Sequence, residues 1–149
     1  MRRAKACLFP NSVNVVKYLG IDFGVRKIGL AVGDDVSGIA FPFGVIAGGE
    51  DAPERIAKIA RHEGIEALVA GIPIPVEAHH TEDQLNMTMA FVTRTGDVAE
   101  LPIHVVDEQF SSAEARRIQR EYGAEAEEDA IAAMLILQAY LDERNRSTL

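Results

Sequence analysis

The segment from Val16 to Asp34 constrains the fold more than any other part of the sequence. It contains two apolar stretches, VKYLGID at 16–22 and KIGLAVGD at 27–34, whose β-branched residues and bounding glycines are typical of strands. The short FGVRK at their junction predicts that the two strands are antiparallel neighbours in one sheet. The first strand ends in a carboxylate, Asp22, and Gly24 follows two positions later.

The rest of the chain alternates between predicted strands and helices. Pro42 favours an edge position for the strand around it, because proline cannot donate a hydrogen bond to a neighbouring strand. The apolar segment EALVAGI is typical of a buried parallel strand. Further strands are expected at 39–46, 66–72 and 102–106, and helices at about 51–62, 81–95, 111–123 and 127–144. This order predicts an α/β fold with a mixed sheet and helices on both of its faces.

Local signals mark several of the helix ends. Pro53 suits a first helical turn, Gly64 is a stop signal, and Ser111–Glu114 matches a capping box. Gly96 is expected near the end of the helix that begins at about residue 81. The apolar face of that helix is predicted to contain Leu85, Met89 and Val92.

Composition and length fit a single soluble domain. The chain has 149 residues, of which 48% are hydrophobic, enough for one core. No apolar run reaches the ~18–20 residues of a membrane span. The single cysteine, Cys7, cannot form an internal disulfide. We therefore expect a flexible leader at 1–14, one domain at 15–149, no membrane partner and a cytoplasmic location.

The net charge limits how the chain could bind nucleic acid. It is −8, whereas proteins that bind nucleic acid are usually basic. A long-range field of this sign repels polyanions. A nucleic-acid-binding function therefore needs local cations, supplied by basic side chains or by bound metal.

Three carboxylates are predicted at the ends of different elements. Asp22 closes the first strand, Glu108 follows the fifth strand directly, and Asp129 lies in the first turn of the last helix. The ends of the first, fourth and fifth strands can share one sheet edge, where ligands commonly bind. Carboxylates that converge there stay ionised together only around a cation, and their oxygens suit Mg²⁺ or Mn²⁺. Two such ions are a usual device for hydrolysing a phosphodiester.

Each of these residues also has a purely structural explanation. Gly24 can be a turn glycine or can let a phosphate approach the backbone beside Asp22. Asp129 can lie at the start of the helix only because a negative charge is stabilising at the positive end of the helix dipole. Glu108 can be a solvated residue at the start of a loop. Their recurrence at element ends is what favours a shared site.

Several basic residues and histidines are further candidates for the site. Arg26 and Lys27 follow Gly24 and are the better candidates for phosphate contacts. Arg116 and Arg120 share a predicted helix face, where pairing with nearby glutamates is the alternative. His79 and His80 lie in one predicted loop, where they could move a proton or simply be solvent-exposed. His62 and His104 are interpreted as structural residues.

Four motifs resemble the YqgF family of RNase H-like nucleases, also called RuvX or Holliday junction resolvase-like. They are LGIDFGVRKIGLAVGD, VAGIP, VVDEQFSSAEA and DAIAAMLILQAYLDE, in the family's order over about residues 17–143. The resemblance implies an RNase H-like fold, with a mixed five-stranded sheet flanked by helices. It also implies nuclease activity in maturation of the 16S rRNA 5′ end, with Holliday junction resolution as an older proposal. By position, Asp22, Glu108 and Asp129 match the family's three acids.

The sequence departs from the family pattern in three places. Gln109 replaces an arginine, PIPVEAHHTEDQ replaces a loop rich in asparagine and glycine, and AEAEED replaces a lysine-rich loop. A non-catalytic nucleic-acid-binding module therefore remains an alternative. An actin-like ATPase is a second one, although it would need two such domains. The sequence leaves open whether the substrate is RNA or branched DNA, whether the protein is a monomer or a homodimer, and whether the ribosome is a partner. It also leaves open whether one metal or two are bound, and whether Asp107 or Glu128 substitutes for one of the chosen ligands.

Overall fold

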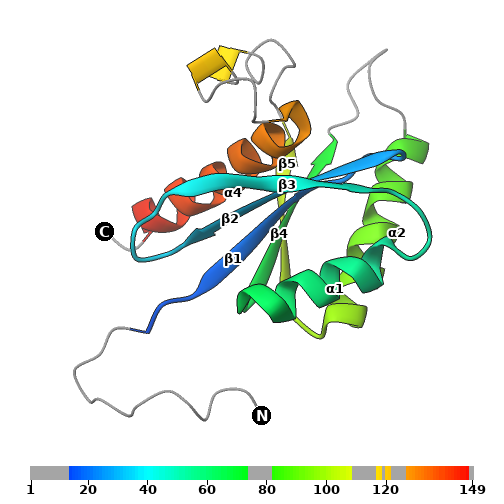
Figure 1. The fold of residues 1–149 in the computed structure, drawn as a ribbon, viewed down its shortest axis with the longest axis horizontal. Coiled ribbons are helices and arrows are strands. Elements are labelled where there is room, and N and C mark those ends of the chain that lie inside the picture. Colours follow the sequence, from blue (N-terminus) through cyan, green and yellow to red (C-terminus); the bar gives the residue numbers. More distant parts are fainter. Residues whose placement is uncertain (1–13, 74–81, 109–116, 119, 122–126, 148–149) are drawn as a thin grey trace.

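The computed structural model describes residues 14–73, 82–108, 117–118, 120–121 and 127–147, with Glu108 and Ser147 described by their backbone alone. The strands are β1 (Lys17–Asp22), β2 (Lys27–Asp34), β3 (Ala40–Ala47), β4 (Ala67–Pro73) and β5 (Ile103–Glu108) (Figure 1). The helices are α1 (Ala52–Glu63), α2 (Glu82–Ala99) and α4 (Glu128–Ser147). These bounds lie close to the predicted ones, apart from the end of α2.

The strands form one mixed sheet in the order β3-β2-β1-β4-β5. β1 pairs antiparallel with β2 and parallel with β4, and β4 pairs parallel with β5. β3, which contains Pro42, lies at the edge, as predicted. Because β1, β4 and β5 run in the same direction, their carboxyl ends meet at one edge of the sheet.

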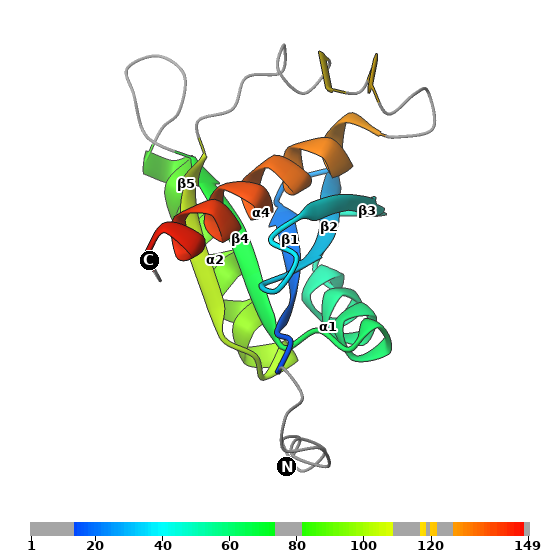
Figure 2. The same cartoon turned by 90° about the vertical axis from the view of Figure 1, so that its left-hand side faces the viewer.

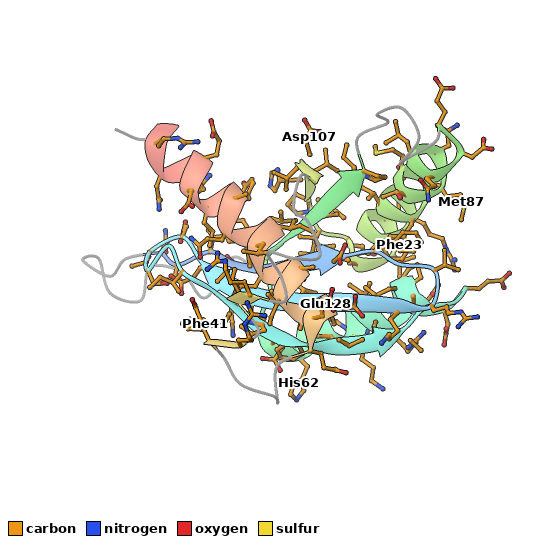
Figure 3. The ribbon with its side chains drawn as sticks, turned by 90° about the horizontal axis from the view of Figure 1, so that it is seen from above. Phe23, Phe41, His62, Met87, Asp107 and Glu128 are labelled. Atoms are coloured by element: carbon orange, nitrogen blue, oxygen red, sulfur yellow. The ribbon has the colours of Figure 1, made fainter. Side chains whose placement is uncertain are left out.

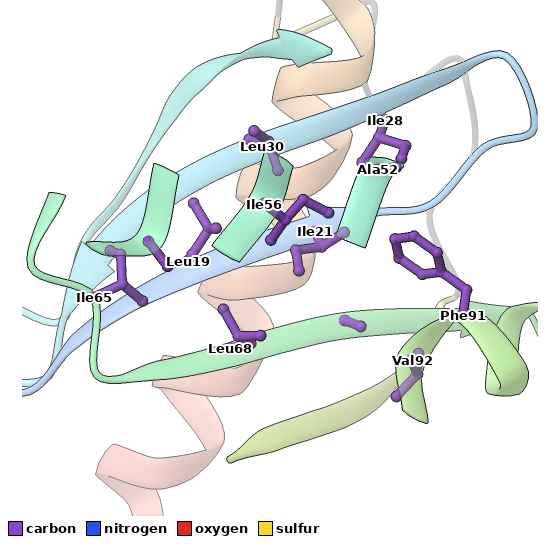
Figure 4. Close-up of a cluster of buried hydrophobic side chains, with 12 residues drawn as sticks. Leu19, Ile21, Ile28, Leu30, Ala52, Ile56, Ile65, Leu68, Phe91 and Val92 are labelled. Carbon is purple, nitrogen blue, oxygen red and sulfur yellow. The ribbon is translucent and has the colours of Figure 1, made fainter. Parts of the chain in front are cut away.

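Helices cover both faces of the sheet, as the sequence predicts. In Figure 2, α4 crosses in front of the sheet, whereas α1 and α2 lie behind it. The side chains between the sheet and α1 and α2 are mostly large and branched (Figure 4). They include Leu19, Ile21, Leu30, Ile56 and Leu68, which are fully buried.

The α4 face of the sheet is built differently, with glycines beneath the helix. A Cβ atom at Gly20 would lie 2.8 Å from Cβ of Leu137, and one at Gly71 would lie 2.6 Å from Cδ1 of Ile136. Both distances are shorter than an ordinary van der Waals contact between carbon atoms. The missing side chains therefore let α4 pack close to the strands through its apolar segment AIAAMLILQAYL.

The ends of α1 confirm the sequence signals, whereas α2 ends beyond the predicted residue 95. Pro53 lies in the first turn of α1, and Gly64 adopts φ 71°, the left-handed conformation that ends a helix. The α2 helix continues past Gly96 to Ala99. A Cβ atom at Gly96 would lie 2.9 Å from Cγ2 of Ile103, so this glycine serves packing against β5 and is not a stop.

The predicted inward face of α2 is wrong at one position. Met89 is 37% exposed, whereas Phe91 and Val92 are buried. The Phe91 ring stacks on Phe23 at a centroid distance of 4.1 Å, and this contact sets how the helix is turned. The residues of α2 that the structure buries are Thr88, Phe91, Val92 and Thr95.

Some predictions fall on parts of the chain that the structure does not describe. These are residues 1–13 of the predicted leader, the loop with His79 and His80, Gln109, and residues 125–126 of the acidic loop. Of the helix predicted at 111–123, only 117–118 and 120–121 are described, and these are helical. Within the described ranges, none of the helices has the length and apolar character needed to cross a membrane.

Candidate active site

Asp22 lies at the carboxyl end of β1, on the same side of the sheet as α4. It is partly buried and pairs across the sheet with Gly29 of β2. Cross-strand partners face the same side, and residues two apart on one strand do so too. Gly20 faces Leu137 of α4. The Asp22 carboxylate therefore leaves the sheet toward the helix that carries Asp129.

The start of α4 packs directly against the cross-strand partner of Asp22. A Cβ atom at Gly29 would overlap the carbonyl oxygen of Asp129. Glycine is therefore required at this position for α4 to begin where it does. This contact places Asp129 over the start of β2, beside the carboxyl end of β1. The sequence motif predicted both acids, and the tertiary packing brings their backbones to one edge of the sheet.

Glu108 ends β5, and its backbone pairs with Pro73 at the end of β4. Its side chain lies outside the described part of the structure, so its predicted role stays a prediction. Asp107 follows Val106, which packs against the α4 side. Strand alternation therefore places Asp107 on the opposite face, away from Asp22 and Asp129. Figure 3 shows Asp107 at the end of β5 and Glu128 at the start of α4.

Lys27 is the cation that the structure brings to Asp129. Its Nζ lies 3.7 Å from Oδ2 of Asp129, and the two side chains are 64% and 39% exposed. Among the side chains that the structure describes, no three acidic, histidine or cysteine groups are close enough to hold a metal ion. Asp22 and Asp129 still supply carboxylate oxygens on one side of the sheet, which is the donor type that Mg²⁺ and Mn²⁺ prefer. These two donors suit such an ion chemically, and Glu108 stays the predicted third ligand.

The turn between β1 and β2 is tightly constrained. A Cβ atom at Gly24 would overlap the carbonyl oxygen of Lys27, so the turn itself requires a glycine there. Gly24 also lines a pocket with Asp22, and the phosphate approach beside it stays a prediction. Arg26 is exposed, and its carbonyl accepts a 2.8 Å hydrogen bond from the backbone N–H of Gly48. The turn therefore holds Arg26 and Lys27 close to Asp22.

The other predicted basic residues lie on the segment between β5 and α4. Arg120 is exposed, and Arg116 falls outside the described residues. Arg117 Nη1 lies 3.6 Å from Oε2 of Glu121, which is the glutamate pairing considered as an alternative for this helix. The structure therefore gives Arg120 an accessible position without placing it beside the carboxylates.

The two described histidines lie away from the carboxylates. His62 is exposed, with Nδ1 3.1 Å from Oε2 of Glu63. The His104 ring stacks on Tyr140 at 5.1 Å, in agreement with a structural role. Tyr140 also contacts Tyr18, and burial, together with Tyr140, raises the pKa of Tyr18 to about 12. This aromatic cluster belongs to the packing of α4 on the sheet.

Sequence reasoning missed a pocket that begins at Asp22. The pocket has a volume of about 440 Å³, and α2 forms one of its walls through Gln84, Met87 and Thr88. Phe23 lines it as well, and its position directly after Asp22 is the signal that could have indicated it. A larger cavity of about 590 Å³ lies at the opposite edge of the sheet, beside the amino ends of β4 and β5. That cavity is remote from the carboxylates.

Comparison with known proteins places this geometry in a family. The family model described as RuvX, Holliday junction resolvase, matches residues 16–143. A protein of Chloroflexus aggregans, named as a candidate pre-16S rRNA nuclease, is 32% identical over 139 residues, which cover 89% of this chain and 97% of that protein. A Legionella pneumophila protein with the same name is 34% identical over 136 residues, covering 85% and 95%.

A solved structure supports the same fold. Thermus thermophilus RuvC in complex with a Holliday junction substrate superposes with a TM-score of 0.58 at 14% identity, covering 87% of this chain and 95% of that one. At this identity the likeness concerns the fold, which is the mixed sheet with helices on both faces. The family model, in contrast, spans all five strands and nearly all of α4, including Asp22, Glu108 and Asp129. The chain therefore belongs to the RuvX family of Holliday junction resolvase-like proteins.

Proposed function

We propose that this protein is a metal-dependent nuclease that hydrolyses nucleic-acid phosphodiester bonds, with precursor 16S rRNA as its substrate. The observation that carries the proposal is the packing of Asp129 on Gly29, which is paired with Asp22. It brings two of the three family acids to one sheet edge. The relatives' name supports the choice of precursor rRNA. The cytoplasm and a ribosomal partner follow from that substrate.

In this proposal Asp22, Glu108 and Asp129 hold one or two divalent cations, Mg²⁺ or Mn²⁺. A bound divalent cation supplies the charge that makes water a nucleophile at neutral pH and stabilises charge on the phosphate. Asp22 contributes a donor from the rigid end of a central strand. Asp129 contributes one from a helix start whose position is fixed by Gly29. Such fixed donors need little rearrangement during the reaction.

The basic residues beside this edge contact the phosphates of the substrate. Lys27 lies close enough to Asp129 to offset its charge, and Arg26 is exposed in the same turn. Gly24 lets the backbone approach a phosphate, and Arg116 and Arg120 contact phosphates further along the strand. With a net charge of −8, binding depends on these few cations and is sensitive to salt.

Holliday junction resolution is the second candidate function, and the description of the matching family favours it. Cutting a four-way junction symmetrically needs two active sites. That function therefore requires a homodimer, whereas rRNA processing is compatible with a monomer. The substrate preference and the oligomeric state in solution distinguish the two candidates.

The test is cleavage of labelled single-stranded RNA, duplex RNA and a four-way DNA junction by the wild type and by Asp22→Asn. Each reaction is run with Mn²⁺, Mg²⁺ or EDTA. Asp97→Asn is the matched control, because Asp97 is exposed on α2. We expect cleavage that needs both metal and Asp22, and that Asp97→Asn retains. Equal cleavage by the wild type and Asp22→Asn would contradict the site, and preference for the junction would favour the second candidate.

A further inference from the structure

An apolar groove leads from Asp22 across the surface toward α2. The pocket at Asp22 shares Phe23, Val25 and Met87 with a second pocket of about 370 Å³. The second pocket extends to Arg94 of α2. Figure 3 shows Phe23 and Met87 on the α2 side of the molecule. The two pockets together form one groove, and we call it the Phe23 groove.

An aromatic ring at a fixed orientation lines this groove. The ring of Phe23 stacks on Phe91 at 4.1 Å with an angle of 24° between the planes. Phe91 is itself packed among the buried side chains between the sheet and α2. Phe23 lines both pockets while it is held in this way, so its ring is ready to receive a planar ligand without first being ordered.

The walls of the groove are apolar and exposed. Val25 is 72% exposed and Met87 is 53% exposed, although both are large hydrophobic residues. At the far end, the Arg94 guanidinium donates hydrogen bonds to the carbonyl oxygen of Glu50 and to Glu54. The groove thus combines a fixed aromatic ring with apolar walls, and the Arg94–Glu54 ion pair lies at its far end. Stacking of bases on such aromatic side chains is how many proteins bind single-stranded nucleic acid.

We infer that the Phe23 groove binds one unpaired nucleobase of the strand that is cut, next to the phosphate held at Asp22. This inference rests on the proposed nuclease function and narrows its substrate. A base inside a continuous duplex is stacked and paired, and it could enter the groove only by leaving the helix. The substrate class is therefore a strand that is unpaired beside the cut. Because every base has a π-face, the groove tolerates any sequence at that position.

The sharpest test compares Met87→Ala with Met89→Ala. The two methionines lie on the same helix, but only Met87 lines the groove, and both are exposed enough for alanine to leave the fold intact. Binding of a short single-stranded RNA is measured by fluorescence anisotropy in the Asp22→Asn background, so that the RNA is not cut. A series of the same RNA carries one abasic residue at each position in turn. Phe23→Leu is a second groove variant.

We expect one abasic position to weaken binding about fivefold or more. Met87→Ala and Phe23→Leu should weaken binding of the intact RNA and lose the sensitivity to that abasic position, whereas Met89→Ala should keep both. Equal binding by Met87→Ala and Met89→Ala, or sensitivity at no position, would overturn the inference. RNA cleavage that depends on Asp22 would in that case still support the nuclease. Base-dependent binding without any such cleavage would instead overturn the nuclease and keep the base site.

Discussion

The two faces of the sheet are packed by opposite means. Between the sheet and α1 and α2, large side chains such as Leu19, Ile56 and Leu68 fill the space. Beneath α4, the strands present Gly20, Gly29 and other glycines, and the helix lies close to the strand backbone. The first face is a conventional core, in which the helices are held at a distance by side chains. The second is a closer contact, in which an added methyl group at Gly20, Gly29 or Gly71 would lie 2.8 Å or less from an atom of α4.

Because of this difference, we expect changes on the first face to affect mainly the stability of the fold. Changes on the α4 face should affect mainly the position of the site. Side chains in a conventional core can adjust when one of them changes volume. Side chains such as Tyr18 and Val69 also pack under α4, but at Gly29 the helix backbone itself meets the strand, and no side chain lies between them that could adjust. Asp129 is carried by that helix, so its position relative to Asp22 depends on the glycine face. On the α2 face, in contrast, the β1–β2 turn and α2 leave the Phe23 groove between them.

The largest expected effect is that of Gly29→Ala. The new methyl group overlaps the carbonyl oxygen of Asp129, so the start of α4 must move away from Asp22. We expect cleavage to fall about 100-fold, as for misplacement of a reacting group by about 1 Å, and overpacking to cost about 1–3 kcal/mol in the free energy of unfolding. Cleavage assays and urea denaturation measure the two effects.

Gly44→Ala is the matched control for this change. Gly44 is also a strand glycine, but a Cβ atom there meets nothing within 4 Å. It should leave cleavage unchanged and alter the free energy of unfolding by less than about 1 kcal/mol. If Gly29→Ala behaved like Gly44→Ala, the glycine face would not position the site.

Ile56→Ala should show the opposite pattern on the other face. Ile56 of α1 is fully buried, and its truncation leaves a cavity. We expect a loss of about 2–5 kcal/mol in the free energy of unfolding. Cleavage per folded molecule should stay close to that of the wild type at a temperature where the variant is folded. A strong loss of specific activity in folded Ile56→Ala would show that both faces position the site.

The smallest expected effect is that of Lys27→Gln on stability. Its ion pair with Asp129 is solvent-exposed on both sides, and such pairs contribute less than about 1 kcal/mol. Its effect should appear in RNA binding, where the slope of log K against log salt concentration should shrink by about 0.7. Lys58→Gln, at an exposed position on α1, should leave the slope unchanged. An unaltered slope in Lys27→Gln would remove Lys27 from the phosphate contacts.

Much of the fold could be predicted because its signals are local. Pro42 indicated the edge strand, the short FGVRK the β1–β2 hairpin, and Gly64 the end of α1. The inward face of α2 could not be predicted in the same way. Met89 and Phe91 are both apolar, and the choice between them depends on stacking with Phe23, which comes from a distant part of the sequence.

The candidate site was predictable in its acids but not in its surroundings. Asp22 and Asp129 could be identified because each lies at the end of an element, and the family resemblance supports both. The requirement for Gly29 depends on where α4 comes to rest, which no local pattern encodes. The Phe23 groove combines the β1–β2 turn with α2, so it exists only once the sheet and helix have packed together.

The central claim is that Asp22 and Asp129 hold the same divalent cation, and Mn²⁺ binding tests it without relying on cleavage. Calorimetric titration compares the wild type, Asp22→Asn, Asp129→Asn and the double variant, with Asp97→Asn as the control. We predict that each single variant weakens binding more than about tenfold, or 1.4 kcal/mol. The double variant should weaken it little further, because the two changes remove one shared site. Wild-type Mn²⁺ affinity in Asp129→Asn would contradict the claim.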